Sequence, residues 1–195
     1  ITLTTATNDF TGAVSLNNSG ANNVAVTDAN AIILGTSSVG TGTLTVTATG
    51  ANSITQTGAI TQAAGAGAAS FTTGGGVITL TQANDFTGAV SASGTNITLV
   101  DTNTITLGTV TASGTLSVTA GTNITNSGTV EPFGSISLVG TGDSAVAVES
   151  GWGGAAWASE GWLRKDGKTL AAATPAIIFV ALPKNCLLDI FEGSA

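Results

Sequence analysis

One eight-residue phrase, present twice, constrains the fold of this chain more than any other feature. Residues 8–15 read NDFTGAVS, and residues 84–91 repeat them letter for letter. Further downstream, residues 42–48 match residues 114–120, at an offset of 72 in place of 76. The two copies therefore differ in length at the junctions between apolar runs and not within the runs, which is where turns accept deletions. Most of the chain is a tandem repeat.

Short apolar triplets recur along the repeat from Ile1 to about Gly140. Each has apolar residues at its outer positions, the period-two pattern of a strand with one buried face. The clearest triplets are residues 1–3, 24–26, 44–46, 78–80, 97–99, 116–118 and 136–138. From residue 78 they begin 19, 19 and 20 residues apart. That spacing is the size of one turn of a parallel β-helix with short strands and Gly, Asn or Ser corners.

The short triplets favour a parallel β-helix over a β-sandwich. In a parallel β-helix each strand pairs with its counterpart in the next turn, about 4.8 Å away, so that like residues stack on like. A sandwich needs strands long enough to cross its faces. We therefore predict an all-β fold, a parallel β-helix or β-solenoid of about seven turns. We also expect matched residues of the two copies to share columns, so that Phe10 and Phe86 lie in one column.

The composition changes at about Gly140. All four basic residues and all three tryptophans lie in the last 55 positions, where the Thr and Asn repeat stops. A change of that size marks a boundary between modules. We predict a β-helix shaft over residues 1–140, made of super-repeats 1–77 and 78–140. A divergent, β-rich capping or assembly segment is predicted over residues 141–195.

The last segment holds two adjacent predicted strands that are strongly apolar. Residues 176–182 form a continuous apolar run, and residues 187–191 return after a Pro-Lys-Asn turn. Strands this apolar require a partner surface, so they cap the rod, pair with another subunit or begin a further domain. The three tryptophans either stack on sugar rings or are buried at the end of the rod or in an interface. The candidate interface residues are Trp152, Trp157, Trp162, Ile177, Ile178, Phe179, Val180, Leu187, Leu188, Ile190 and Phe191.

The inventory of charged and nucleophilic residues argues against several classes of function. The formal charge is −7, from 4 basic and 11 acidic residues, which disfavours nucleic acid as a partner. No apolar run reaches about 18 residues, so we expect no transmembrane span. The absence of His leaves no Ser-His-Asp or Cys-His set. We expect neither an enzyme nor a bound cofactor.

The carboxylates of the repeat are the remaining candidates for chemistry. Asp28 and Asp101 are equivalents in the two copies, as are Asp9 and Asp85. Three turns would separate each pair by roughly 14 Å, which is too far for the paired carboxylates of glycoside hydrolysis. We interpret these aspartates as turn residues that bond their own backbone. The Gly-Gly-x-Gly-x-Asp repeat of calcium-binding β-rolls is absent, and no metal site is predicted.

Thr-x-Thr pairs raise the alternative of an ice-binding face. Such a face needs the pair at one phase in nearly every turn. The second copy, however, has Ser117 where the first has Thr45. Selection of β-branched residues for strand propensity is the simpler explanation.

The order of the repeated phrases resembles the repeats of filamentous-haemagglutinin-like adhesins. The match covers about residues 1–138 and consists of NDFTGAVS, Asp-x-Asn, Leu-Gly-Thr, Gly-Thr-Leu-x-Val-Thr-Ala and Ile-Thr-Gln-x-Gly. The resemblance implies a right-handed parallel β-helix, export from a Gram-negative bacterium through an outer-membrane partner, and display at the cell surface. It does not extend into the segment beyond about Gly140.

The expected function is that of a secreted or cell-surface β-solenoid, a non-catalytic adhesin shaft or structural segment in cell adhesion. Its expected partners are a host or neighbouring-cell surface or an extracellular polysaccharide. The alternative is a subunit of an extracellular fibre, a homo-oligomer joined end to end through the C-terminal tail. Ice binding is the third hypothesis.

Overall fold

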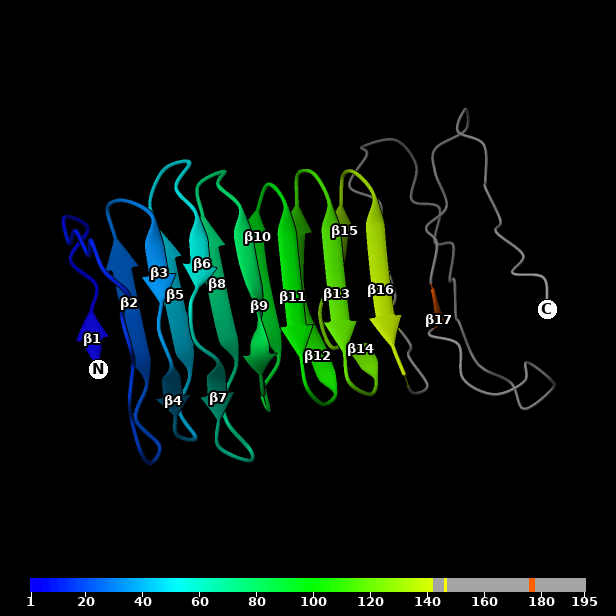
Figure 1. The fold of residues 1–195 in the computed structure, drawn as a ribbon, viewed down its shortest axis with the longest axis horizontal. Helices are drawn as coiled ribbons and strands as arrows, with labels where there is room; N and C mark the ends of the chain where they lie inside the picture. The colour runs from blue at the N-terminus through cyan, green and yellow to red at the C-terminus, as the bar shows by residue number, and fades with distance from the viewer. Residues whose placement is uncertain (142–145, 147–175, 178–195) are drawn as a thin grey trace.

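The computed structural model describes residues 1–141, residue 146 and residues 176–177 (Figure 1). Every element in this part of the chain is a β-strand, and the strands wind into a rod with the N-terminus at one end. The first sheet contains, in spatial order, β1 (Thr2–Leu3), β2 (Val24–Asp28), β5 (Leu44–Ala48), β8 (Ala69–Thr73), β10 (Val90–Gly94), β12 (Ile105–Ala112) and β14 (Ile124–Asn126), with β15 (Val130–Pro132) also beside β12.

The second sheet faces the first across the core. It contains, again in spatial order, β17 (Ala176–Ile177), β16 (Ile136–Gly140), β13 (Leu116–Ala120), β11 (Ile97–Asp101), β9 (Ile78–Asn84), β6 (Ile54–Gln56) and β3 (Ile32–Leu34). A short third sheet pairs β4 (Ser37–Val39) with β7 (Ile60–Gln62). Most strands that follow one another in the sequence lie in different sheets, and each strand pairs with strands one turn away. The fold is therefore a β-solenoid of about seven turns, as the sequence predicted.

Parallel stacking of like residues builds the interior. Ile97 lies in register with Ile78 on one side and Leu116 on the other. In the interior turns the outer residues of the triplet, such as Ile97 and Leu99, are buried, while the Thr or Ser between them points outward. Full burial of one such aliphatic side chain contributes about 1.5–3 kcal/mol, so the core is a sum of small identical contributions along the rod.

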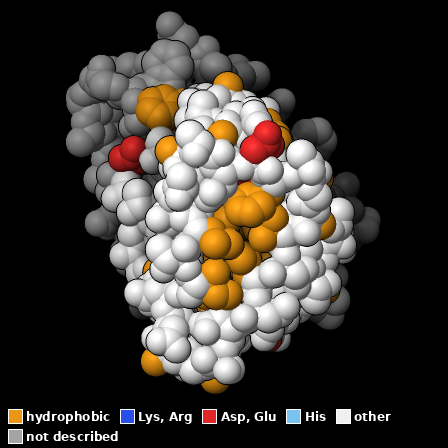
Figure 2. Space-filling model, turned by 90° about the vertical axis from the view of Figure 1, so that its left-hand side faces the viewer, with side chains coloured by type: hydrophobic (Ala, Val, Ile, Leu, Met, Phe, Trp, Pro, Cys, Tyr) orange, Lys and Arg blue, Asp and Glu red, His pale blue; other side chains and the backbone are white. Residues whose placement is uncertain are grey.

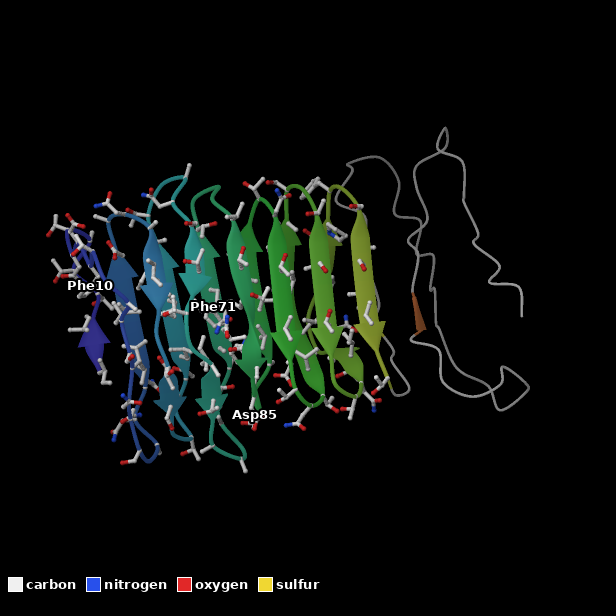
Figure 3. The ribbon with its side chains drawn as sticks, in the orientation of Figure 1. Phe10, Phe71 and Asp85 are labelled. Atoms are coloured by element: carbon white, nitrogen blue, oxygen red, sulfur yellow. The ribbon has the colours of Figure 1, made fainter. Side chains whose placement is uncertain are left out.

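The two copies of the repeat lie half a turn out of phase. Three turns carry the chain from β1 to β8 within the first sheet, and the second copy begins half a turn later, at β9 in the second sheet. Figure 3 accordingly shows Phe10 well above Asp85, which lies at the lower loops. The expectation that Phe10 and Phe86 share a column was therefore wrong. Phe86 instead packs edge-on against Phe71, with ring centroids 5.8 Å apart.

The physical reason is that stacking requires only an apolar triplet on each neighbouring turn. Val24 pairs with Leu44 after 20 residues, Leu44 with Ala69 after 25, and Val90 with Leu107 after 17. Because the corners differ so much in length, one super-repeat need not occupy a whole number of turns, even where its sequence is repeated exactly. Matching phrases can therefore fall on opposite sheets.

The C-terminal end of the rod is covered in part by the chain itself. Ala176 and Ile177 form an antiparallel pair with Gly140 and Val139 at the edge of the second sheet. The beginning of the predicted apolar run therefore lies against the last turn. The rest of the predicted segment 141–195 is outside the described residues, apart from Thr141 and the buried Val146. The division into 1–140 and 141–195 stays a prediction.

Candidate functional site

Two buried aspartates fix the corners at which the repeated phrase begins. Asp28, at the end of β2, accepts hydrogen bonds from the backbone N–H of Asn30 at 2.9 Å and of Phe10 at 3.1 Å. Asp101, at the end of β11, accepts the same two bonds, from Asn103 at 2.8 Å and Phe86 at 2.7 Å. Each carboxylate thus turns its own backbone and also holds the neighbouring turn.

The sequence predicted only half of this arrangement. The bond to the residue two positions on follows from the Asp-x-Asn phrase. The bond to the phenylalanine N–H of the adjacent turn was not anticipated. Its only signal was that Asp-x-Asn follows NDFTGAVS at a similar distance in both copies.

Burial makes the Asp101 carboxylate harder to ionise. Desolvation raises its pKa above the ordinary value of 3.8, and the nearby Asp85 carboxylate acts in the same direction. The N–H groups of Phe86 and Asn103 oppose this shift, because they stabilise the charged form. The Asp101 carboxylate therefore has a structural role, because both of its oxygens accept hydrogen bonds from backbone N–H groups.

A partly buried amide pair joins the second copy to the turn before it. The Gln56 side chain donates to Asn84 Oδ1 at 2.8 Å, and Asn84 Nδ2 donates back to Gln56 Oε1 at 3.0 Å. The Ile60 N–H also donates to Asn84 Oδ1, at 2.9 Å. Within the described residues, no buried side-chain nitrogen or oxygen lacks a hydrogen-bond partner, so the polar groups inside the rod are satisfied.

The matched carboxylates of Asp28 and Asp101 do not lie side by side. Asp28 lies in the first sheet and Asp101 in the second, with the apolar core between the sheets. The expected three-turn separation was therefore wrong in detail, because the copies are three and a half turns apart. In the described part of the chain no three His, Cys, Asp or Glu residues come close enough to hold a metal ion.

The outer face of the first sheet carries two adjacent columns of small hydroxyl residues. One column runs through Thr27, Thr47, Thr72 and Ser93, which are in register on successive strands. The other runs through Thr45, Ser70 and Ser91. Stacking occurs between neighbouring turns and not between super-repeats, so Ser117 is not the residue above Thr45. The comparison of copies in the sequence had therefore underestimated this array.

The N-terminal end of the rod exposes its core. Ile1 and Leu3 are each 40% exposed, and Phe10 and Val14 are only partly buried against the interior. Figure 2 views this end directly and shows a continuous hydrophobic patch surrounded mostly by uncharged polar atoms, with an acidic side chain near its upper edge. An apolar patch with such a rim is the usual appearance of an interaction surface.

The interface residues predicted in the C-terminal segment lie outside the described residues, with one exception. Ile177 is placed beside Val139, at the last turn of the rod. The roles proposed for the tryptophans and for the other apolar residues of that segment stay predictions. The exposed hydrophobic residues Ile1 and Leu3 were not among the predicted sites.

Among the described residues there is no helix with the length and hydropathy needed to cross a bilayer. A search of curated proteins and a search of solved structures found no match. A sequence model of a family described as "Repeats of unknown function" (DUF5649) matches residues 1–17, 21–93 and 94–149. These stretches cover most of the chain and include both copies of NDFTGAVS. The chain therefore belongs to this family of repeats.

Proposed function

We propose that this chain is a non-catalytic shaft segment of a secreted or cell-surface adhesin, displayed by a Gram-negative bacterium. The observation that carries the proposal is the unbroken parallel stack from β1 to β16, with its polar interior groups satisfied. Such a rod gains stability with each added turn and provides length without a folded catalytic domain.

The surface of the shaft supports the same proposal. Residues 1–141 contain no Lys or Arg and only five acidic residues. The outward positions of both sheets are mostly Thr, Ser and other short side chains. A surface of this kind suits contact with neutral polysaccharide or cell-surface glycans through hydroxyl groups. The order of the repeated phrases, which resembles that of filamentous-haemagglutinin-like adhesins, adds the expectation of export and surface display.

The test is performed on the organism that encodes the chain. Antibodies raised against the purified protein should label intact cells, and brief protease treatment of those cells should remove the label. Deletion of the gene should lower attachment of the cells to host cells or to polysaccharide-coated surfaces, and restoring it should recover attachment. Labelling only after lysis, or unchanged attachment, would reject the proposal.

A polysaccharide hydrolase is the contrasting class. Purified protein should release no reducing ends from acidic or neutral polysaccharides. A turnover that is abolished by both Asp28→Asn and Asp101→Asn, in variants with native circular dichroism, would reinstate an enzyme. Because these two carboxylates are buried in hydrogen bonds to the backbone, we expect their replacement to affect stability alone.

Ice binding is kept as a second candidate because of the two hydroxyl columns on the first sheet. A flat, regular array of hydroxyl groups can order water at the strand spacing. The serines at positions 70, 91 and 93 weaken the match, since they lack the methyl group of threonine. Measurable thermal hysteresis that is lost in Thr47→Lys and kept in Thr119→Lys, a control on the other sheet, would favour this candidate.

The fibre alternative, with copies joined end to end through the C-terminal tail, makes a different prediction for the purified protein. It requires filaments by electron microscopy and a sedimentation coefficient that rises with concentration in the micromolar range. A discrete monomer under these conditions would leave the shaft as the better account.

A further inference from the structure

The same sequence occurs in two different environments within this molecule. The tetrapeptide at residues 1–4 is identical to that at residues 78–81. Ile78 and Leu80 are completely buried, whereas Ile1 and Leu3 are each 40% exposed. The exposure differs because the turn with β6 packs against the N-terminal side of Ile78 and Leu80. None of the described residues packs against the corresponding side of Ile1 and Leu3.

The turn that covers the second copy shows which chemistry this surface accepts. The Asp85 N–H donates to the Ile60 carbonyl at 3.0 Å, and the Gln62 N–H donates to the Asp85 carbonyl at 2.9 Å. The Gln62 side chain accepts from the Gly88 N–H at 3.2 Å. Together with the Gln56–Asn84 amide pair, these contacts come from residues 56–62 of the preceding turn.

The first copy already makes the inner half of this network. Asn8 Nδ2 donates to the carbonyls of Leu3 and Thr27, as Asn84 Nδ2 does to those of Leu80 and Val100. In the second copy, Asn84, Asp85 and Gly88 form hydrogen bonds with the preceding turn. Their equivalents Asn8, Asp9 and Gly12 have no such turn beside them within the described residues. The N-terminal end is therefore preorganised by the rest of the rod to receive one.

We infer that this N-terminal end face, defined by Ile1, Leu3, Asn8, Asp9 and Phe10, is an assembly site for another repeat of the same family. The occupant is a solenoid turn whose strands pair in parallel with the end face, like the segment at residues 54–62. It carries Ile at the positions of residues 54 and 60 and Gln at those of residues 56 and 62. The first glutamine pairs with Asn8, and the second bonds Asp9 and Gly12 as it bonds Asp85 and Gly88 inside the rod.

A second copy of this chain fits the face less well. Its last turn has Asn126 and Pro132 at the positions of Gln56 and Gln62. Proline has no N–H to donate, so the bond that Gln62 makes to Asp85 cannot form. The edge of β16 in that copy is also paired with Ala176 and Ile177. A repeat with glutamine at both positions can form all of these hydrogen bonds, whereas the last turn of a second copy cannot. The face should therefore bind a glutamine-bearing repeat in preference to a second copy of this chain.

The experiment adds one super-repeat to the intact chain. Residues 1–77 are fused directly ahead of Ile1, so that the junction Val77–Ile1 reproduces the natural junction between Val77 and Ile78. Hydrogen exchange measured by NMR should slow at least about tenfold for the Asp9 and Gly12 amides of the original copy, as each gains a buried hydrogen bond. The unfused chain should be a monomer in sedimentation velocity.

The matched control carries Gln62→Pro in the added super-repeat alone, and a second control carries Gln62→Leu in case the proline prevents docking altogether. Both should return the Gly12 amide to fast exchange, while in the leucine variant the Asp9 amide stays slow through its bond to Ile60. The inference is overturned if fusion leaves both amides unchanged. It is also overturned if the unfused chain associates head to tail and protects the Asp9 amide by itself, since the occupant would then be a second copy. None of these outcomes depends on the adhesin role.

Discussion

A pair of glycines in the duplicated phrase offers the sharpest test of the stacked structure. Gly12 and Gly88 occupy the same position of NDFTGAVS. A Cβ atom added at Gly88 would lie 2.1 Å from the carbonyl oxygen of Gly67 on the preceding turn, whereas one added at Gly12 meets nothing within 4 Å. The same substitution, Gly→Ala, should therefore have opposite effects at the two sites.

The magnitudes follow from the geometry. Contact between a Cβ and a backbone oxygen at 2.1 Å forces two turns apart by about 1 Å, and overpacking of this kind costs about 1–3 kcal/mol. At Gly12, alanine mainly restricts the unfolded chain, which stabilises by about 0.4–1 kcal/mol where the backbone conformation is compatible. The free energies of unfolding of Gly88→Ala and Gly12→Ala should differ by about 1.4–4 kcal/mol.

Urea unfolding followed by far-ultraviolet circular dichroism measures this difference, with the slope of the free energy against urea compared between variants. Equal effects at the two positions, or destabilisation by Gly12→Ala as large as that by Gly88→Ala, would refute the stacked arrangement with an open first turn. In the tandem fusion described above, Gly12 becomes a covered position. There Gly12→Ala should become destabilising.

Three further predictions use the same molecule. Phe86→Ala should cost about 3–5 kcal/mol in urea unfolding, because it removes a buried ring that packs on its neighbour, and Phe10→Ala should cost less than half as much. Asn84→Ala should destabilise by about 1–3 kcal/mol in the same assay, since it leaves buried amide and N–H groups unpaired, with Asn8→Ala as the milder control. Because the folded state raises the pKa of Asp101, it binds that proton more tightly than the unfolded chain. The resulting stabilisation is complete below pH 3.8 and is lost as the pH rises through the raised pKa, so Asp101→Asn should remove this component from the unfolding free energy measured against pH.

The sequence predicted the parts of the fold that depend on local pattern. Alternating triplets specified strands with one buried face, and their spacing specified the turn of a solenoid. The residues on the inner face, such as Ile97, Leu99 and Val118, are buried as the alternation required. The Asp-x-Asn corners were correctly assigned to turns that bond their own backbone.

What the sequence did not specify is which turn lies beside which. Apolar triplets are interchangeable as stacking partners, because burial depends on area and not on letter identity. The length of the corners then sets the winding, and only the tertiary structure shows that one super-repeat occupies three and a half turns. That half turn places Asp28 and Asp101 on opposite sheets, and the winding aligns Thr45 with Ser70, because stacking partners come from neighbouring turns and not from matching copies.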